Sequence, residues 1–406
     1  MMNFDSQKQT FANGFSMEVV SRPNFKEKFF GIMIDVGSSD VQPISGMAHF
    51  LEHQLFNKAD GDLSLKFDQL GASVNAYTAS NETMFYATSL NNTTKVIDLL
   101  FNLVCQPFFD EKTVAKERGI VKQELAMYQD DPKWWVINEL KIQMFGKTPL
   151  GLDGLGSKTS IDSMTPKALL DFYQQEYTAQ KMHFIAVGDF STTAIKQMFT
   201  QVKKLTKDVP AGGKFQSQAL QFGKLKDQEI VKPESKLFGV GLAFDFQKAD
   251  LDDPSMDQAI LEMMLEMQFG GMSNFYQQAV IAKVINDEVD YSMEINREGA
   301  FAMIVGISSS PKQVFTLIDD TLSSPMPDES QFNLMKKSWI SHYFRLYNDL
   351  SDWAIELSES ALDGENLADF AEKMNKLSFD QFWQRGCELL EHSHIVHVNT
   401  GKGGKV

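Results

Sequence analysis

The chain has 406 residues, of which 43% are hydrophobic and 23% are charged, and these are the proportions of a folded protein long enough for more than one core. Its formal net charge of −16 argues against nucleic-acid binding, because contacts with phosphate need clustered Lys and Arg. The two cysteines, Cys105 and Cys387, lie in apolar runs, so no disulfide framework is expected. Asp, Lys or Gly interrupts every apolar run, and residues 1–20 hold no apolar signal segment. We therefore expect a cytoplasmic protein without a membrane span.

The first 189 residues are predicted to contain short strands and helices. Strands are predicted where apolar residues alternate or form short continuous runs, and helices where they recur three and four residues apart. An Asn-Gly pair at 13–14 indicates a hairpin turn, and Asp-Asp-Pro at 130–132 is expected to end a helix. The predicted strands are 15–20, 29–36, 73–78, 84–90 and 181–189, and the predicted helices are 44–56, 62–70, 93–104, 110–128 and 165–173.

The predicted helix 44–56 carries the sequence H-F-L-E-H at residues 49–53. Residues three and four apart share one face of a helix, so His49, Glu52 and His53 project together. Two neutral imidazoles can hold one zinc ion, and a carboxylate beside them can take a proton from water on that metal. This order of residues is typical of inverted zincins. The same five-residue pattern also occurs by chance in buried helices. The pattern alone therefore does not distinguish a zinc site from a buried helix, and the rest of the sequence has to be considered.

The predicted helix 110–128 contributes two carboxylates, Glu117 and Glu124, which lie seven residues and two turns apart on one side. Such a pair is usually a solvated helix surface. A catalytic zinc ion with two histidine ligands, however, needs a third protein ligand and leaves one position for water. A glutamate on a later helix could supply that ligand, and the spacing alone leaves both interpretations open.

The second half of the chain repeats the pattern of the first. Three pairs of strand segments match, at offsets of about 208 to 216 residues: 30–33 with 238–241, 85–89 with 301–305, and the strand after His183 with the strand after His394. This pattern indicates a duplicated domain. We predict domains at 1–207 and 229–406, joined by a linker at 208–228 that contains Pro and Gly.

The predicted fold class is α+β, with two similar α/β domains in tandem, each an antiparallel-rich sheet flanked by helices. The first helix of the copy, 254–269, reads Leu-Glu-Met-Gln-Phe at 265–269, where the first half has its histidines. A metal site is therefore expected only in the first domain. The histidines at 392, 394 and 397 are interpreted as structural, since His394 is the counterpart of His183 and ligands three apart on a strand face opposite sides.

The motif, with Gly-Met-Ala before it at 46–48, and the segment 117–124 together resemble the pitrilysin/insulinase family of zinc peptidases. The likeness is greatest to bacterial two-domain members and to mitochondrial processing peptidase, and it covers nearly the whole chain. It implies that Glu124, 71 residues after His53, is the third zinc ligand and that Glu117 is its accompanying carboxylate.

The resemblance also indicates where substrate binds. Residues Asn75, Ala76 and Tyr77 match the edge strand to which a substrate peptide adds as a further strand. Tyr291 matches a tyrosine of the second domain that grips substrate, but Val284 stands seven residues before it, where active members carry Arg. The residues after the motif, Gln54 and Asn-Lys at 57–58, depart from the family pattern as well.

The resemblance implies a zinc-dependent endopeptidase with one Zn²⁺ per chain, which hydrolyses peptides or unfolded polypeptides in a cleft between two domains. Glu52 is expected to act as the general base. Chains of this kind assemble as homodimers or with a related subunit. The alternative is a structural partner subunit without activity, which the missing Arg favours; the intact set of His49, Glu52, His53 and Glu124 favours the enzyme.

Overall fold

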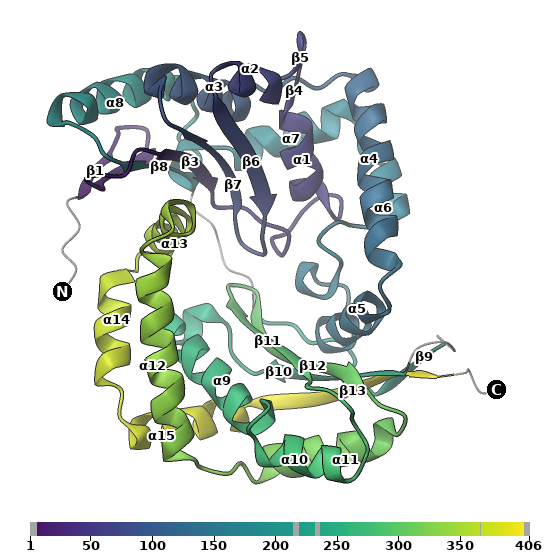
Figure 1. Ribbon diagram of the computed structural model, residues 1–406. Helices are drawn as coiled ribbons and strands as arrows, with labels where there is room; N and C mark the ends of the chain where they lie inside the picture. The colour runs from purple at the N-terminus through teal and green to yellow at the C-terminus, as the bar shows by residue number, and fades with distance from the viewer. Residues whose placement is uncertain (1–5, 214–218, 232–235, 366, 402–406) are drawn as a thin grey trace. The chain divides into compact units, whose positions relative to one another are not determined.

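The computed structural model of the protein describes residues 6–213, 219–231, 236–365 and 367–401 (Figure 1). The chain forms two compact units, and each unit combines segments from both halves of the sequence. Unit 1 comprises residues 1–123, 154–216 and 342–371, and unit 2 comprises residues 124–153, 217–341 and 372–406. Each unit is a mixed sheet covered by helices, which confirms the predicted fold class of two similar α/β domains.

Unit 1 is built on a six-stranded sheet in the order β1-β2-β8-β3-β7-β6. Its strands are β1 (Ser6–Thr10), β2 (Ser16–Ser21), β3 (Lys28–Ile34), β6 (Ala72–Thr78), β7 (Thr83–Ser89) and β8 (Met182–Gly188). Its helices are α1 (Met47–Leu55), α2 (Ser64–Gln69), α3 (Thr93–Cys105), α6 (Lys158–Asp162), α7 (Pro166–Glu176), η2 (Ala179–Lys181), α8 (Thr192–Leu205) and α13 (Leu350–Asp363), with a short hairpin of β4 (Asn57–Lys58) and β5 (Gly61–Asp62). β2 and β8 are parallel, whereas the other neighbours are antiparallel.

Unit 2 is built on a five-stranded sheet in the order β11-β12-β10-β13-β9. Its strands are β9 (Gln228–Val231), β10 (Leu237–Phe244), β11 (Asp290–Asn296), β12 (Gly299–Ile307) and β13 (Ser393–Gly401). Its helices are α5 (Pro132–Phe145), η1 (Pro149–Gly151), η3 (Lys248–Asp250), α9 (Pro254–Phe269), α10 (Asn274–Ile281), α11 (Pro311–Ser323) and α15 (Phe379–Glu391). Three further helices have residues in both units: α4 (Glu111–Gln129), α12 (Glu329–Leu346) and α14 (Leu367–Lys376). Read from β9 to β11, this sheet repeats the order and directions of β2-β8-β3-β7-β6 in unit 1.

Helices cover both faces of the sheet in unit 1. On one face, Phe184 of β8 packs against Phe101 of α3, with ring centroids 5.6 Å apart. On the other face, the next residue of the strand, Ile185, joins Trp353 of α13 in a buried cluster. Successive side chains of a strand point to opposite faces, so a strand covered on both sides is apolar throughout. This double cover explains why every residue of β8 is buried.

Each unit contains one helix that comes from the other half of the chain. α13 follows α12 in the second half of the chain but packs on β3 and β8 of unit 1, whereas α5 follows α4 in the first half but packs on β10 and β13 of unit 2. The compact units are therefore not the continuous stretches 1–207 and 229–406. These two ranges stay a prediction for the duplicated segments, and the predicted linker at 208–228 lies partly outside the described residues.

The strand pairing corrects the register of the repeat. One row of paired residues in unit 1 runs His183, Met33, Met84, Tyr77, and the matching row in unit 2 runs His394, Ala243, Phe301, Glu294. If His183 corresponds to His394, Met33 corresponds to Ala243 and Met84 to Phe301. The matches of 30–33 with 238–241 and of 85–89 with 301–305 were thus wrong by two residues and one residue. Short apolar runs look alike when shifted by a position or two, and only the pairing fixes them.

The predicted helices are present, but several further helices were not predicted, among them α5, α6 and α8. α1 begins at Met47 rather than near Ile44, and α4 covers almost the predicted range. Residues 130–132 do end α4, but they also begin α5, because the Asp131 side chain accepts a hydrogen bond from the Lys133 amide and Pro132 occupies the first turn. The signal that stops one helix therefore starts the next.

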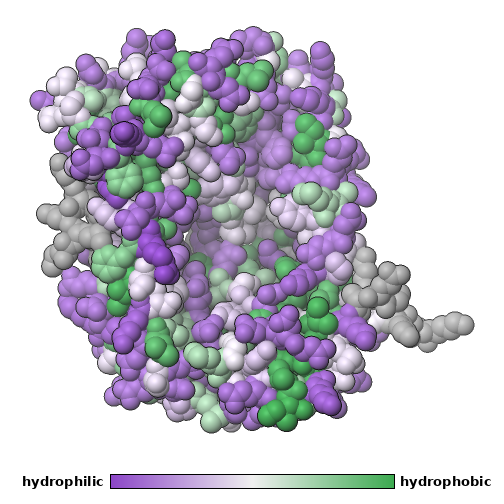
Figure 2. Space-filling view, in the orientation of Figure 1, coloured by the Kyte–Doolittle hydropathy of each residue, from purple (hydrophilic) through white to green (hydrophobic). Residues whose placement is uncertain are grey.

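The surface in Figure 2 is largely hydrophilic, as the excess of acidic residues leads one to expect. Some large apolar residues of the chain are exposed as well; Met272 and Ile281, for example, are 61% and 80% exposed. Within the described ranges, no helix has the length and apolar character needed to cross a membrane.

Candidate metal centre

The start of helix α1 depends on Gly46. This residue has a left-handed backbone, with φ of 83°, directly before Met47. A Cβ at Gly46 would also collide with the backbone carbonyl of Leu155, so glycine is needed both for its conformation and for its size. The turn therefore fixes where α1 begins and which side of the helix carries His49 and His53.

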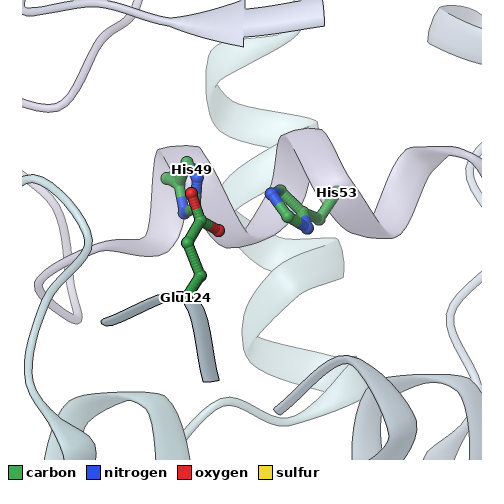
Figure 3. Close-up of side chains that lie close together, drawn as sticks. All are labelled: His49, His53 and Glu124. Atoms are coloured by element: carbon green, nitrogen blue, oxygen red, sulfur yellow. The ribbon is translucent and has the colours of Figure 1, made fainter. Parts of the chain in front are cut away.

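His49 and His53 of α1 lie together with Glu124 of α4 (Figure 3). The two imidazole rings are 4.6 Å apart between centroids. One ligand atom from each of the three half-buried side chains lies within 4.8 Å of the others. A single ion about 2 Å from each atom needs only small side-chain rotations to be bound by all three. In the part of the chain that the structure describes, this is the one group of three His, Cys, Asp or Glu residues with such geometry.

Helix α4 brings Glu124 to this position. The buried side chain of Gln54, on α1, donates to the Thr113 hydroxyl near the start of α4 at 2.9 Å, which ties the two helices together. Glu124 is the first residue assigned to unit 2, but it continues the same helix two turns beyond Glu117. The departure from the family pattern at Gln54 thus serves the packing of the two helices that carry the candidate ligands.

Glu117 contacts His53 directly. Its Oε1 lies 3.1 Å from His53 Nδ1, and its Oε2 accepts a hydrogen bond from Asn57 Nδ2 at 3.1 Å. The carboxylate is 4% exposed. When Nδ1 carries a hydrogen and donates it to Glu117, the lone pair of Nε2 is left for a metal ion. The geometry suits the predicted orienting role of Glu117, which stays a prediction.

His49 is suited to bind a metal near neutral pH. Burial and, to a smaller extent, the neighbouring His53 lower the pKa of its imidazole to about 4, against an opposing effect of Glu117. The ring is therefore uncharged at pH 7, as a metal ligand must be.

Glu52 lies on the same side of α1 but outside the group of three. Its side chain is largely buried, with 7% of the residue exposed, and its Oε2 accepts a hydrogen bond from the Thr78 hydroxyl at 3.0 Å. It is three residues from His49 and one from His53, so it lies next to the candidate ligands. The predicted role of Glu52 as general base stays a prediction.

The strand β6, which contains Asn75, Ala76 and Tyr77, is the edge strand of its sheet. Asn75 donates to the Tyr86 hydroxyl at 3.3 Å, and the Tyr77 hydroxyl donates to Glu359 of α13 at 3.1 Å. Ala76 alternates with these two residues and faces the same side as Thr78, toward Glu52. The expected edge strand is present, while the binding of substrate to it stays a prediction.

Tyr291 lies in the other unit, on β11, where its hydroxyl donates to the Glu266 carboxylate. Burial and this neighbouring carboxylate raise the pKa of the phenol. Val284 occupies the position expected for Arg and is only 3% exposed, so it is a core residue with no group that could hold substrate. The substrate-binding role of Tyr291 stays a prediction.

Three residues at or near the site were missed or left unassigned by the sequence. Asn57 supports Glu117, and Thr78 supports Glu52, although neither belongs to the motif. Lys58 is buried and donates to the carbonyls of Leu103 and Gln106, which holds β4 against the end of α3. Burial lowers the pKa of this ammonium group to about 8. Residues 57 and 58 thus have local partners that account for their departure from the family pattern. Thr78 could be noted only as the last residue of the segment 75–78, which resembles the family's edge strand.

Comparison with known proteins identifies the family. Residues 18–158 match the model of the insulinase family, peptidase family M16, and residues 163–324 match the model described as the peptidase M16 inactive domain. The zinc protease YmfH of Bacillus subtilis is 26% identical over 390 residues, which covers 92% of this chain and 91% of that protein. A mitochondrial-processing peptidase subunit beta of Lentinula edodes is 29% identical over 185 residues, 44% of this chain and 40% of that protein.

Solved structures have the same fold. A protease from Helicobacter pylori has a TM-score of 0.82 at 17% identity, with 98% of this chain and 100% of that chain covered. A peptidase M16 inactive domain from Pseudomonas fluorescens has a TM-score of 0.83 at 18% identity, with 99% and 98% covered. Taken with the motif on α1, these similarities confirm the expected relationship, and the chain belongs to the insulinase (M16) family of peptidases.

Proposed function

We propose that the protein is a zinc-dependent endopeptidase. The observation that supports this most is the group of His49, His53 and Glu124, whose ligand atoms lie within 4.8 Å of one another. Two imidazoles and one carboxylate form the ligand set of catalytic zinc sites that keep a fourth position open. The name of the relative YmfH, a zinc protease, agrees with this choice of metal. We expect about one zinc ion per chain, since the described part of unit 2 offers no comparable group.

The residues around the site would have different roles in peptide hydrolysis. A zinc ion bound by the three ligands would acidify water and polarise the carbonyl of the scissile bond. Glu52 accepts the proton of the attacking water and passes it to the leaving amine. Glu117 holds His53 in the orientation and tautomer that binding requires. The free edge of β6, with Asn75, Ala76 and Tyr77, would hold the substrate in an extended conformation beside Glu52.

The substrate of such a site is a peptide or an unfolded polypeptide, because adding a strand to β6 requires a backbone without its own partners. Tyr291 is the candidate contact from the second unit. We further propose that the chain is cytoplasmic and works as a homodimer or with a related subunit. The relative from Lentinula edodes is named as one subunit of a processing peptidase, which supports the second possibility.

An inactive partner subunit is the second candidate. It is favoured by one observation, the buried Val284 at the position expected for the substrate-gripping Arg. Zinc content and cleavage separate the two functions. The purified protein, with and without any related chain that co-purifies, is analysed for zinc and incubated with a library of unstructured peptides. The enzyme is expected to cleave with its zinc bound and to stop after chelation. Zinc-loaded protein that cleaves nothing in either state would establish the partner subunit.

A further inference from the structure

The hydroxyl of Thr78 is in direct contact with the candidate general base. Thr78 Oγ1 donates to Glu52 Oε2 at 3.0 Å. A carboxylate that accepts a hydrogen bond on one oxygen loses its freedom to rotate about the terminal bond, and charge-assisted bonds of this kind are the stronger ones. The second oxygen of Glu52 is then presented in one direction. The hydrogen bond from Thr78 therefore contributes to the orientation of this carboxylate.

Thr78 is itself held firmly. It is the last residue of β6 and pairs with Thr83, the first residue of β7. Thr83 is fully buried, and its hydroxyl donates to the Val36 carbonyl at 2.8 Å. The end of the β6–β7 hairpin is thus anchored to the segment that follows β3, and Thr78 is a fixed donor rather than a mobile surface side chain.

The second unit does not repeat this contact. In the strand register in which His183 corresponds to His394, Ile295 takes the place of Thr78, because Glu294 takes that of Tyr77. Ile295 has no hydroxyl, and its backbone amide donates to the Gln258 side chain of α9 at 3.3 Å. β11 thus keeps its place in the sheet without a hydroxyl at this position, so strand pairing does not explain the hydroxyl of Thr78.

We infer that Thr78 is a positioning residue for Glu52, which couples the orientation of the base to the strand on which substrate is expected to lie. The inference rests on the proposed peptidase function and adds a residue to it. Because Thr78 terminates β6, a peptide added to the edge of β6 and the carboxylate that activates water share one rigid element. Displacing Thr78 would turn the base without removing it.

Thr78→Val tests this, because valine keeps the shape and strand preference of threonine and loses only the hydroxyl. We expect kcat to fall roughly 10- to 100-fold, the range for lost partners of site residues, with KM and zinc content unchanged. Thr78→Ser should restore most of the rate. In the Glu52→Gln background, Thr78→Val should have almost no further effect, since the carboxylate that it orients is gone.

Thr88→Val is the matched control. Thr88 is a half-buried residue of the neighbouring strand β7, and its replacement should leave kcat unchanged. A crystal structure of Thr78→Val gives a result that does not depend on activity: the Glu52 carboxylate is expected to leave the position it occupies beside residue 78. A carboxylate that stays in place, or a rate equal to that of the wild type, would overturn the inference even if the protein is a peptidase. A wild type without any cleavage would overturn the proposed function instead.

Discussion

The two sheets of this molecule have the same strand order, yet only one of them supports a candidate metal site. Strands β10 and β3 occupy equivalent central places and are buried on both faces. Helix α1, beside the first sheet, carries His49, Glu52 and His53, whereas α9 of the second is mostly buried apolar residues. The fold of each sheet is stabilised by buried apolar area, which many sequences can supply. A metal site depends instead on a few particular polar side chains. A duplicated fold can therefore lose one site without losing its shape.

A second contrast concerns one histidine in each sheet. His183 is the second residue of β8 and is buried, with Nδ1 2.9 Å from the Ser16 hydroxyl. Its counterpart His394 is the second residue of β13 and lies at the surface, with Nε2 2.6 Å from Asp245. The backbone position is the same, but one ring is desolvated and the other is paired with a carboxylate. Equivalent places in a repeat thus do not imply equivalent electrostatics.

Removing a candidate ligand should have the largest effect. His49→Ala, His53→Ala or Glu124→Gln should each lower the zinc content from about one per chain toward zero, because a catalytic site with three protein ligands does not hold its metal with two. His394→Ala, on the other sheet, serves as the control and should keep its zinc. Elemental analysis of the purified variants measures this. Two zinc ions per chain, or full occupancy in the Glu124 variant, would contradict the assignment.

Replacing the candidate base Glu52 should have the next largest effect. Glu52→Gln keeps the size of the side chain and removes the base, so peptide hydrolysis should fall by roughly 10²- to 10⁴-fold while zinc and fold are retained. Gln258→Glu, on α9 of unit 2, is the control: it lies outside the group of His49, His53 and Glu124 and should leave the rate unaltered. Steady-state cleavage of one peptide by each variant is the measurement. Equal rates for Glu52→Gln and the wild type would remove Glu52 from the mechanism.

The buried histidine should make unit 1 sensitive to acid. Burial, with a smaller contribution from Lys8, lowers the pKa of His183 from 6.5 to about 4, so the folded state disfavours its protonation. The stabilisation is complete above pH 6.5, where the unfolded chain is also neutral, and is lost as the pH falls from 6.5 toward 4. The shift corresponds to a loss of up to about 3 kcal/mol. Urea unfolding at pH 7 and pH 4.5 should show a smaller loss for His183→Gln than for the wild type, and equal losses would contradict the prediction.

The smallest expected effect is a difference in stability between alanine variants of glycines in the two central strands, β10 and β3. A Cβ at Gly239 of β10 would lie 2.5 Å from Val136 and 2.8 Å from Leu140 of α5, so Gly239→Ala should destabilise unit 2 by about 1–3 kcal/mol. At Gly31 of β3 the first obstacle is the flexible tip of Met84, which can move, so Gly31→Ala should cost less. Thermal unfolding followed by calorimetry compares the two. A larger loss for Gly31→Ala would show that β3 packs more tightly than this geometry implies.

The sequence by itself determined the features that depend on neighbours along the chain. The spacing of His49, Glu52 and His53 places them on one side of a helix whatever the rest of the fold does. The strands and helices that alternation and helical periodicity predicted in the first half lie within a few residues of the observed ones. Glu124 could be singled out as the third ligand only through the family resemblance. The periodicity of α4 left it equally a surface residue until its ligand atom was found beside the two imidazoles.

Only the tertiary structure decided the features that depend on contacts between distant segments. The exchange of α5 and α13 escaped prediction because a helix with an apolar face fits either sheet, and nothing local says which sheet it covers. The register of the repeat was shifted because apolar strands match at several offsets, whereas backbone pairing allows one. Thr78 and Glu52 are 26 residues apart, and their contact exists because α1 packs against β6. The periodicity of a segment can be read from its own residues. The segment against which it packs depends on the packing of the whole chain.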